Sequence, residues 1–172
     1  MSDLTSERAA EPNARVSDIP RVQSVLASTD FSDVANQAIP HAYAAVDDGG
    51  SVHLVHVLEA PETPSPLYAH YRPGQVPSAD ERQKLHADLG ARLRALAPAG
   101  AAGRGIRTEV HVVDDATVAA GIARTARQLG VDLICVGTHG RSGLFKTLLG
   151  SVTEAVLRET RSPVLVVPRR GR

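Results

Sequence analysis

The sequence has little of several residue types, and each shortage excludes a class of function. Trp is absent and aromatic residues make up only 3% of the 172 residues, which argues against an aromatic platform that stacks single-stranded nucleic acid. Cys135 is the only cysteine, so the chain has neither an internal disulfide nor a zinc site built from thiolates. Because Cys135 lies in an apolar run, we expect it to be a small buried hydrophobic residue.

Net charge and long hydrophobic runs are lacking too. Nineteen basic and nineteen acidic residues give a formal net charge of zero, so no long-range field draws the chain to nucleic acid or to an anionic membrane. No apolar run approaches the ~18 residues that span a bilayer. Residues 1–20 are polar and lack the apolar core of a signal peptide. We therefore predict a flexible leader over 1–20, a cytoplasmic location, and no nucleic-acid or membrane partner.

A regular alternation of strand and helix patterns fills residues 21–170 and indicates one domain, long enough to bury a core. Apolar runs predict strands at 22–28, 51–58, 106–112, 133–136 and 164–167. Helices are predicted at 32–48, 78–97, 115–129 and 152–160, with Asp114 or Asp115 capping the third and Pro40 bending the first. This order is typical of an α/β fold in which helices cover both faces of an open five-stranded parallel sheet.

The burial pattern of the strands predicts their order. The strand at 106–112 alternates apolar residues with Arg107, Glu109 and His111, which indicates that one of its faces is exposed to solvent. Such a strand belongs at an edge of the sheet. The first and fourth strands are mainly apolar and belong in the centre. The strand order 3-2-1-4-5 satisfies both conditions, and it puts a switch point between strands one and four. Ligands of such sheets bind there, beyond the carboxyl ends of the strands.

Two segments stand apart from this regular pattern. The last strand, 164–167, is apolar on both faces yet lies at an edge in the predicted order; since an exposed apolar edge invites pairing, we predict a homodimer through it. Residues 60–77 hold five of the eleven prolines and two of the three tyrosines, which predicts a long loop. That loop is either a lid over a ligand or, as we favour, a mobile or dimer-contacting segment.

A glycine-rich run is the segment of the sequence that is most informative about function. It reads Gly137-x2-Gly140-x9-Gly150-Ser151, and it starts where a strand ends and finishes where a helix begins. Glycines let backbone N–H groups approach phosphate oxygens, and a helix N-terminus adds unpaired N–H donors with a partial positive charge. We predict an anion site made by residues 150–153, with the hydroxyls of Ser151 and Thr153 as further donors. Val152 contributes its N–H group to this site.

The rest of the run completes the predicted site. Gly137 and Gly140 are expected at the ribose and inner phosphate, with Arg141 on the intervening loop to neutralise phosphate charge. An alternative needs no ligand, because Ser151 and Glu154 also fit a helix capping box. Two other phosphate motifs are excluded: Phe145 replaces the glycine that a Walker A loop needs before its lysine, and no Rossmann G-x-G-x-x-G follows the first strand.

Together with other motifs, this run resembles the universal stress protein family. The other motifs are the turn Thr29-Asp30-Phe31-Ser32, the pair His56-Val57, and the tail Ser162-Pro163-Val164-Leu165-Val166-Val167. The resemblance implies a Rossmann-like fold that binds ATP, homodimers, and roles in stress tolerance or signalling, sometimes with slow ATP hydrolysis. It also implies that Asp30 faces the adenosine, that Val57 lies against the adenine, and that Gly137, Gly140, Gly150 and Ser151 hold the ribose and phosphates.

Three functional hypotheses follow. The first is a regulatory module that binds an adenine nucleotide, with Val57 and Val136 covering the base, Thr29 and Asp30 in the turn beside it, and Mg²⁺ or Mn²⁺ bridging the phosphates. The second is a slow hydrolase, although no complete catalytic set is visible. The third is an interaction protein with an empty pocket. Of the histidines, only His139 is expected near a ligand. His53 and His56 point to opposite faces of a strand, so we predict no metal site.

Overall fold

The computed structural model describes residues 20–59, 78–138 and 149–169. The predicted leader and the predicted loop at 60–77 therefore lie outside the described residues, except for Pro20. The strands are β1 (Ser24–Ser28), β2 (Ser51–Glu59), β3 (Arg107–Asp115), β4 (Leu133–Gly137) and β5 (Val164–Val167). The helices are α1 (Asp33–Asn36), α2 (Ala38–Ala45), α3 (Ala79–Arg94), the 3₁₀ helix η1 (Ala99–Arg104), α4 (Val118–Leu129) and α5 (Ser151–Glu159).

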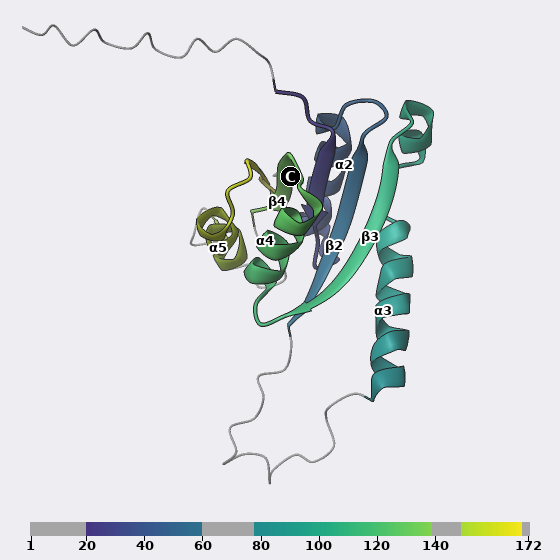
Figure 1. Ribbon diagram of the computed structural model, residues 1–172, viewed down its shortest axis with the longest axis vertical. Coiled ribbons are helices and arrows are strands. Elements are labelled where there is room, and N and C mark those ends of the chain that lie inside the picture. The colour runs from purple at the N-terminus through teal and green to yellow at the C-terminus, as the bar shows by residue number, and fades with distance from the viewer. Residues whose placement is uncertain (1–19, 60–77, 139–148, 170–172) are drawn as a thin grey trace, which may run out of the picture.

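The five strands form one sheet in the order β3-β2-β1-β4-β5, and all four neighbouring pairs are parallel. The predicted fold class and strand order are thus confirmed. Helices α2 and α3 lie on one side of the sheet, and α4 and α5 lie on the other (Figure 1). The chain reverses its direction of winding between β1 and β4, which creates the predicted switch point.

Strand composition explains this arrangement. In β1, Val25 and Ala27 point into the cluster under α2, while Leu26 points into the cluster under α4. A strand buried on both faces has to be apolar throughout, and such strands take the central positions. Strand β3 has exposed and half-buried residues in alternation at its start, as an edge strand should. Cys135 is fully buried in β4, and desolvation raises the pKa of its thiol to about 12.

The first helix differs from its prediction. Instead of one bent helix, α1 ends at Asn36 and α2 begins at Ala38, with Gln37 between them. Pro40 accounts for the break, because it has no N–H group to donate to the Asn36 carbonyl and its ring crowds that carbonyl. Pro40 thereby falls in the first turn of α2, where no N–H donor is needed.

The predicted cap of the third helix is wrong. Neither Asp114 nor Asp115 caps α4; both complete β3, and the Thr117 hydroxyl accepts the capping hydrogen bond from the Ala120 N–H at 3.1 Å. Asp115 instead pairs with Arg124 at 2.8 Å.

The capping box of Ser78 and Glu81 is present in α3. Within the described ranges, no helix has the length and apolar character needed to cross a membrane.

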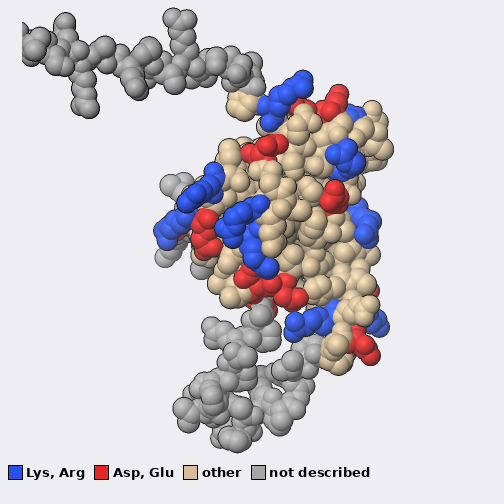
Figure 2. All heavy atoms as spheres, viewed as in Figure 1, with Lys and Arg blue, Asp and Glu red and all other residues tan. Residues whose placement is uncertain are grey.

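Charged side chains are dispersed over the surface. On the face drawn in Figure 2, basic and acidic groups are interspersed, and neither sign covers it. Several of them form ion pairs with each other, among them Arg104 with Asp48 at 2.6 Å and Arg124 with Asp115 at 2.8 Å. This distribution agrees with the balanced composition of the sequence.

Candidate functional site

A cavity of about 300 Å³ opens at the switch point, beyond the carboxyl ends of β1 and β4. Its size is at the lower end of the range for small-molecule sites. Strands β1, β2 and β4 and helices α1, α4 and α5, or the turns beside them, contribute to its walls, whereas β3 and β5 do not. The lining residues are Ser28, Thr29, Asp30, Ala35, Val55, His56, Val57, Val118, Val136, Gly137, Gly150, Ser151, Val152 and Thr153.

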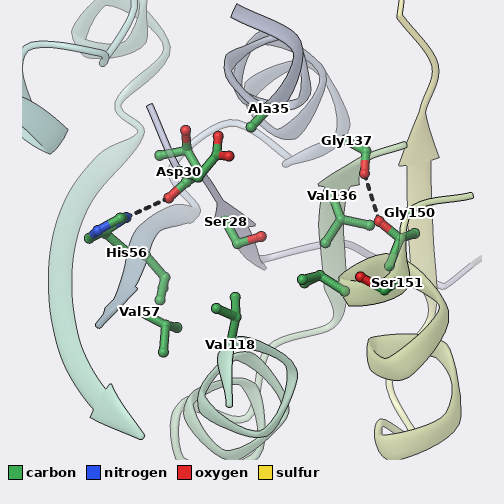
Figure 3. Close-up of a pocket in the computed structure, with 14 residues that line it drawn as sticks. Ser28, Asp30, Ala35, His56, Val57, Val118, Val136, Gly137, Gly150 and Ser151 are labelled. Atoms are coloured by element: carbon green, nitrogen blue, oxygen red, sulfur yellow. Dashed lines mark hydrogen bonds between the residues drawn. The ribbon is translucent and has the colours of Figure 1, made fainter. Parts of the chain in front are cut away.

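The walls of the cavity are mainly apolar. Val57 from β2 and Val136 from β4 lie on opposite sides, and Val118 from α4 lies between them (Figure 3). Gly121 lets α4 come this close to β2, because a Cβ atom there would lie 2.6 Å from Cγ1 of Val57. A planar apolar group fits between such walls without leaving a buried polar atom unpaired.

The N-terminus of α5 forms a polar end of the cavity. Gly150 is the N-cap residue, and the Glu154 N–H makes the first helical hydrogen bond, to the Gly150 carbonyl at 3.0 Å. The N–H groups of residues 151–153 precede that bond, so they have no partner inside the helix. Within the described part of the chain no side chain caps this end. The capping-box alternative is therefore wrong, since Ser151 is the first helical residue and not the cap.

Two of the predicted donors have protein partners instead. The Gly150 N–H donates to the Thr138 carbonyl at 2.6 Å. The Thr153 hydroxyl donates to the Gly137 carbonyl at 2.8 Å, and Thr153 is only 3% exposed. The expectation that these two groups would face a ligand is corrected accordingly. Three N–H groups and the exposed Ser151 hydroxyl remain on the cavity side.

The turn after β1 forms the other polar end. The Thr29 hydroxyl donates to the Asn36 side chain at 2.7 Å and accepts from the Phe31 N–H at 2.8 Å. One carboxylate oxygen of Asp30 accepts from the Ser32 N–H at 2.9 Å. Phe31 has a φ of 65°, a left-handed conformation that is unfavourable for a bulky side chain. The hydrogen bonds on both sides of Phe31 hold this turn in place.

His56 buttresses the same turn from β2. Its Nδ1 lies 2.8 Å from the Thr29 carbonyl oxygen, and because a carbonyl only accepts, Nδ1 must carry the proton. Figure 3 shows this bond beside the cavity. The Phe31 ring packs on the His56 ring with centroids 4.7 Å apart. The guanidinium of Arg92, on α3, lies 4.1 Å from the centroid of the Phe31 ring. His56 is thus a positioning residue for Thr29 and Asp30.

The structure brings together most of the residues that the sequence singled out. All nine that fall within the described residues line the cavity: Thr29, Asp30, Val57, Val136, Gly137, Gly150, Ser151, Val152 and Thr153. His139, Gly140 and Arg141 lie outside the described residues. Sequence reasoning missed five lining residues: Ser28, Ala35, Val55, His56 and Val118. Ser28 was detectable as the last residue of β1, whereas nothing local marks Ala35 or Val118.

Gly137 has a structural role that the motif did not reveal. A Cβ atom at this position would lie 3.1 Å from both the Ala35 Cα and the Val34 carbonyl oxygen. Glycine is therefore needed for the close approach of α1 to the end of β4. Both Ala35 and Gly137 line the cavity, so this contact forms part of its wall (Figure 3).

The fold and the cavity define an α/β protein with a ligand-sized site at the switch point of a parallel sheet. The family model of the universal stress protein family matches residues 21–168, and the chain belongs to that family. Universal stress protein YxiE of Bacillus subtilis is 32% identical over 146 residues, which cover 83% of this chain and 97% of that protein.

A second relative is similar over a shorter stretch. Universal stress protein MJ0577 of Methanocaldococcus jannaschii is 48% identical over 50 residues, which span only 31% of that protein. The solved structure of MJ0577 superposes over 89% of this chain and all of that chain, with a TM-score of 0.69 and 27% identity. UspA from Lactobacillus plantarum has a TM-score of 0.60 at 19% identity, covers 87% of this chain and 99% of that one, and shares the fold.

Proposed function

We propose that this protein binds ATP, or a closely related adenine nucleotide, as a regulatory universal stress protein. One observation carries the proposal: a single cavity combines an apolar slot, a carboxylate at one end, and the N-terminus of α5 at the other. An adenine nucleotide has the same sequence of parts, namely a planar base, a sugar with hydroxyl groups, and a chain of anionic phosphates.

The base and the ribose occupy the strand side of the cavity. Adenine lies between Val57 and Val136, where burial of its faces supplies hydrophobic free energy. Asp30 accepts hydrogen bonds from the ribose hydroxyls or from a base N–H, in addition to the one that it accepts from the Ser32 N–H. Among the described lining residues Asp30 is the only carboxylate, and the His56 and Thr29 contacts keep its turn in position.

The phosphates occupy the α5 end. The N–H groups of Ser151, Val152 and Thr153 donate to phosphate oxygens, and the helix dipole favours negative charge there. His139, Gly140 and Arg141 complete this end in the prediction from the sequence. A Mg²⁺ or Mn²⁺ ion would be held mainly by phosphate oxygens and water, as Mg²⁺ commonly is.

The relatives add support at the level of the fold. A universal stress protein solved in complex with cAMP superposes over 88% of this chain with a TM-score of 0.55 and 20% identity. That likeness concerns the fold alone, so the cavity of this chain has to carry the proposal. The cytoplasmic location and slow ATP hydrolysis remain predictions from the sequence.

Thermal-shift titration tests the proposal. The full chain is heated with increasing ATP, ADP, AMP or cAMP, because a ligand that binds only the folded state raises the melting temperature by mass action. We expect ATP and ADP to raise it more than AMP does, since AMP offers the α5 N-terminus a single phosphate. GTP is the matched control for base selectivity. No shift with any adenine nucleotide, confirmed by calorimetric titration, would contradict the proposal.

We further propose that the protein forms a homodimer through β5. Within the described strands β5 pairs only with β4, so its outer edge presents backbone groups to a partner. Leu165 is 37% exposed on this strand. Sedimentation equilibrium of the wild type and of Leu165→Lys should give a dimer and a weakened dimer, respectively. A monomeric wild type at micromolar concentration would contradict the proposal.

A further inference from the structure

Three potential metal ligands meet on the sheet away from the cavity. Nδ1 of His53 lies 3.1 Å from Nε2 of His111, and a carboxylate oxygen of Glu109 lies 3.5 Å from the former and 4.0 Å from the latter. All three ligand atoms lie within 4.8 Å of one another. None of the three residues lines the cavity.

Strand register explains this cluster. In the β2–β3 pair, His53 is opposite Glu109, and Val55 is opposite His111. Side chains two residues apart on a strand share a face, so Glu109 and His111 both project on the side from which His53 projects. Strand β3 is the edge of the sheet (Figure 1), which leaves the cluster open on one side. His53 is buried at 6% exposure, whereas the Glu109 side chain is 50% exposed.

Hydrogen bonding orients the buried ligand. Nε2 of His53 lies 3.2 Å from the Ser24 hydroxyl oxygen on β1. When that nitrogen donates to Ser24, the Nδ1 lone pair points at His111 and Glu109. Metal-binding histidines are usually held in this way by a partner on the second ring nitrogen. Burial lowers the pKa of both His53 and His111 below the ordinary value of a histidine.

In the tautomer in which Nε2 of His53 donates to Ser24, Nδ1 of His53 is unprotonated and the Glu109 carboxylate lies beside it. A cation between these groups would remove the repulsion between their lone pairs. The Arg107 guanidinium adds positive charge near His53. Its Nη1 donates to the Gly49 carbonyl at 3.1 Å and not to the three clustered side chains.

We propose that His53, Glu109 and His111 bind a Zn²⁺ ion, with water completing the coordination. Zn–N bonds of about 2.0–2.1 Å in a tetrahedron put neighbouring ligand atoms roughly 3.3 Å apart, and the observed separations of 3.1, 3.5 and 4.0 Å are close to that value. Imidazole and carboxylate ligands in this ratio suit Zn²⁺ better than Mg²⁺ or Ca²⁺, which prefer oxygen. The ion would link β2 to the edge strand β3.

Calorimetric titration of the untagged, chelator-treated full chain with ZnCl₂ tests the site. We expect one ion per chain in the wild type, and at least about tenfold weaker binding in His111→Gln and Glu109→Gln. Ser24→Ala should weaken binding by about 10–100-fold, the usual effect of losing the partner of a ligating histidine. His41→Gln, on α2 and outside the cluster, is the matched control and should bind as the wild type does.

Two further measurements make the test decisive. Co²⁺ in place of Zn²⁺ should give the visible absorption of a four-coordinate ion in the wild type and lose it in His111→Gln. Zn²⁺ should raise the melting temperature of the wild type but not of Glu109→Gln, whose circular dichroism should stay unchanged. Absence of stoichiometric binding would overturn the proposal, and so would equal affinity in the wild type and both ligand variants.

Discussion

The Thr153 hydroxyl donates a hydrogen bond to the Gly137 carbonyl across 2.8 Å, and this bond joins the first turn of α5 to the end of β4. The two residues are sixteen positions apart in the sequence. The bond therefore holds the N-terminus of α5 beside the end of β4. A second bond, from the Gly150 N–H to the Thr138 carbonyl, acts beside it. Together they hold residues 151–153, whose N–H groups have no partner inside the helix, in the wall of the cavity.

Loss of this bond should therefore affect both stability and binding. Thr153→Val keeps the shape of the side chain but leaves the Gly137 carbonyl without this donor, which should cost about 1–3 kcal/mol of unfolding free energy. ATP affinity should fall as well, because α5 is less firmly oriented. Thr153→Ser, which keeps the hydroxyl, is the control. Urea unfolding and nucleotide titration measure the two effects, and equal behaviour of both variants would show that the bond is unimportant.

A substitution at Ser151 distinguishes an effect on phosphate binding from an effect on folding stability. It is exposed in the first turn of α5, so Ser151→Asp puts a negative charge where the helix dipole is favourable and should stabilise the helix by about 0.3–1 kcal/mol. The same charge repels phosphates. We expect lost ATP affinity with an unchanged or raised melting temperature, while the neutral Ser151→Asn retains binding. Full ATP affinity in Ser151→Asp would place the phosphates elsewhere.

Gly121 controls the width of the apolar slot. Gly121→Ala would put a Cβ atom 2.6 Å from Cγ1 of Val57, and a β-branched side chain has little rotameric freedom to yield. Overpacking of this kind costs about 1–3 kcal/mol, and displacement of Val57 into the cavity should weaken nucleotide binding. Gly90→Ala on α3 meets no atom within 4 Å and should stabilise the protein slightly. Denaturant unfolding of both variants checks the contrast.

The buried thiol of Cys135 should make the free energy of unfolding depend on pH in the alkaline range. Burial raises the pKa of its thiol from 9.0 to about 12, so above pH 9 the unfolded chain releases a proton that the folded chain keeps. Stability from this group is fully present below pH 9 and is lost as the pH rises toward 12. The slope approaches about 1.4 kcal/mol per pH unit.

Cys135→Ala lacks this slope and serves as the comparison, with unfolding free energies measured in urea at several alkaline pH values. The pKa of Tyr43 is also raised by burial, but Tyr43 contributes equally to both proteins and cancels in the difference. Parallel curves for the wild type and Cys135→Ala would contradict the prediction. Thiol reagents should modify native Cys135 only as fast as the protein unfolds, because the side chain is fully buried.

Much of the fold was predictable because the relevant signals are local. The apolar β1 and β4, together with β3 and its one solvent-exposed face, were enough to order the sheet. The alternation of residues along a strand shows whether one face or both faces are buried. The cap of α4 was not predictable in the same way. Asp115 and Thr117 can both cap a helix, and the choice depended on how far β3 pairs with β2, up to Asp115 opposite Glu59.

The candidate site shows the same division. Gly150 was found because it lies where a helix begins, and such positions converge at one edge of a parallel sheet. The resemblance to the universal stress protein family pointed to Asp30 and Val57. Val118 and Ala35 were missed because they reach the cavity only through the packing of α4 and α1. The histidines show the limit most clearly: His53 and His56 cannot share an ion on one strand, but His53 meets His111 on the next.

The sequence by itself determined most secondary-structure elements, the strand order, and the edge of the sheet where the candidate site lies, because hydrophobic periodicity and turn chemistry act over a few residues. Only the tertiary structure decided which donors remain available. It directs the Thr153 hydroxyl to Gly137 and leaves three N–H groups of α5 on the cavity side, and it sets Glu109 beside His53. Those outcomes depend on distances between residues far apart in the chain, which are fixed only when the whole core packs.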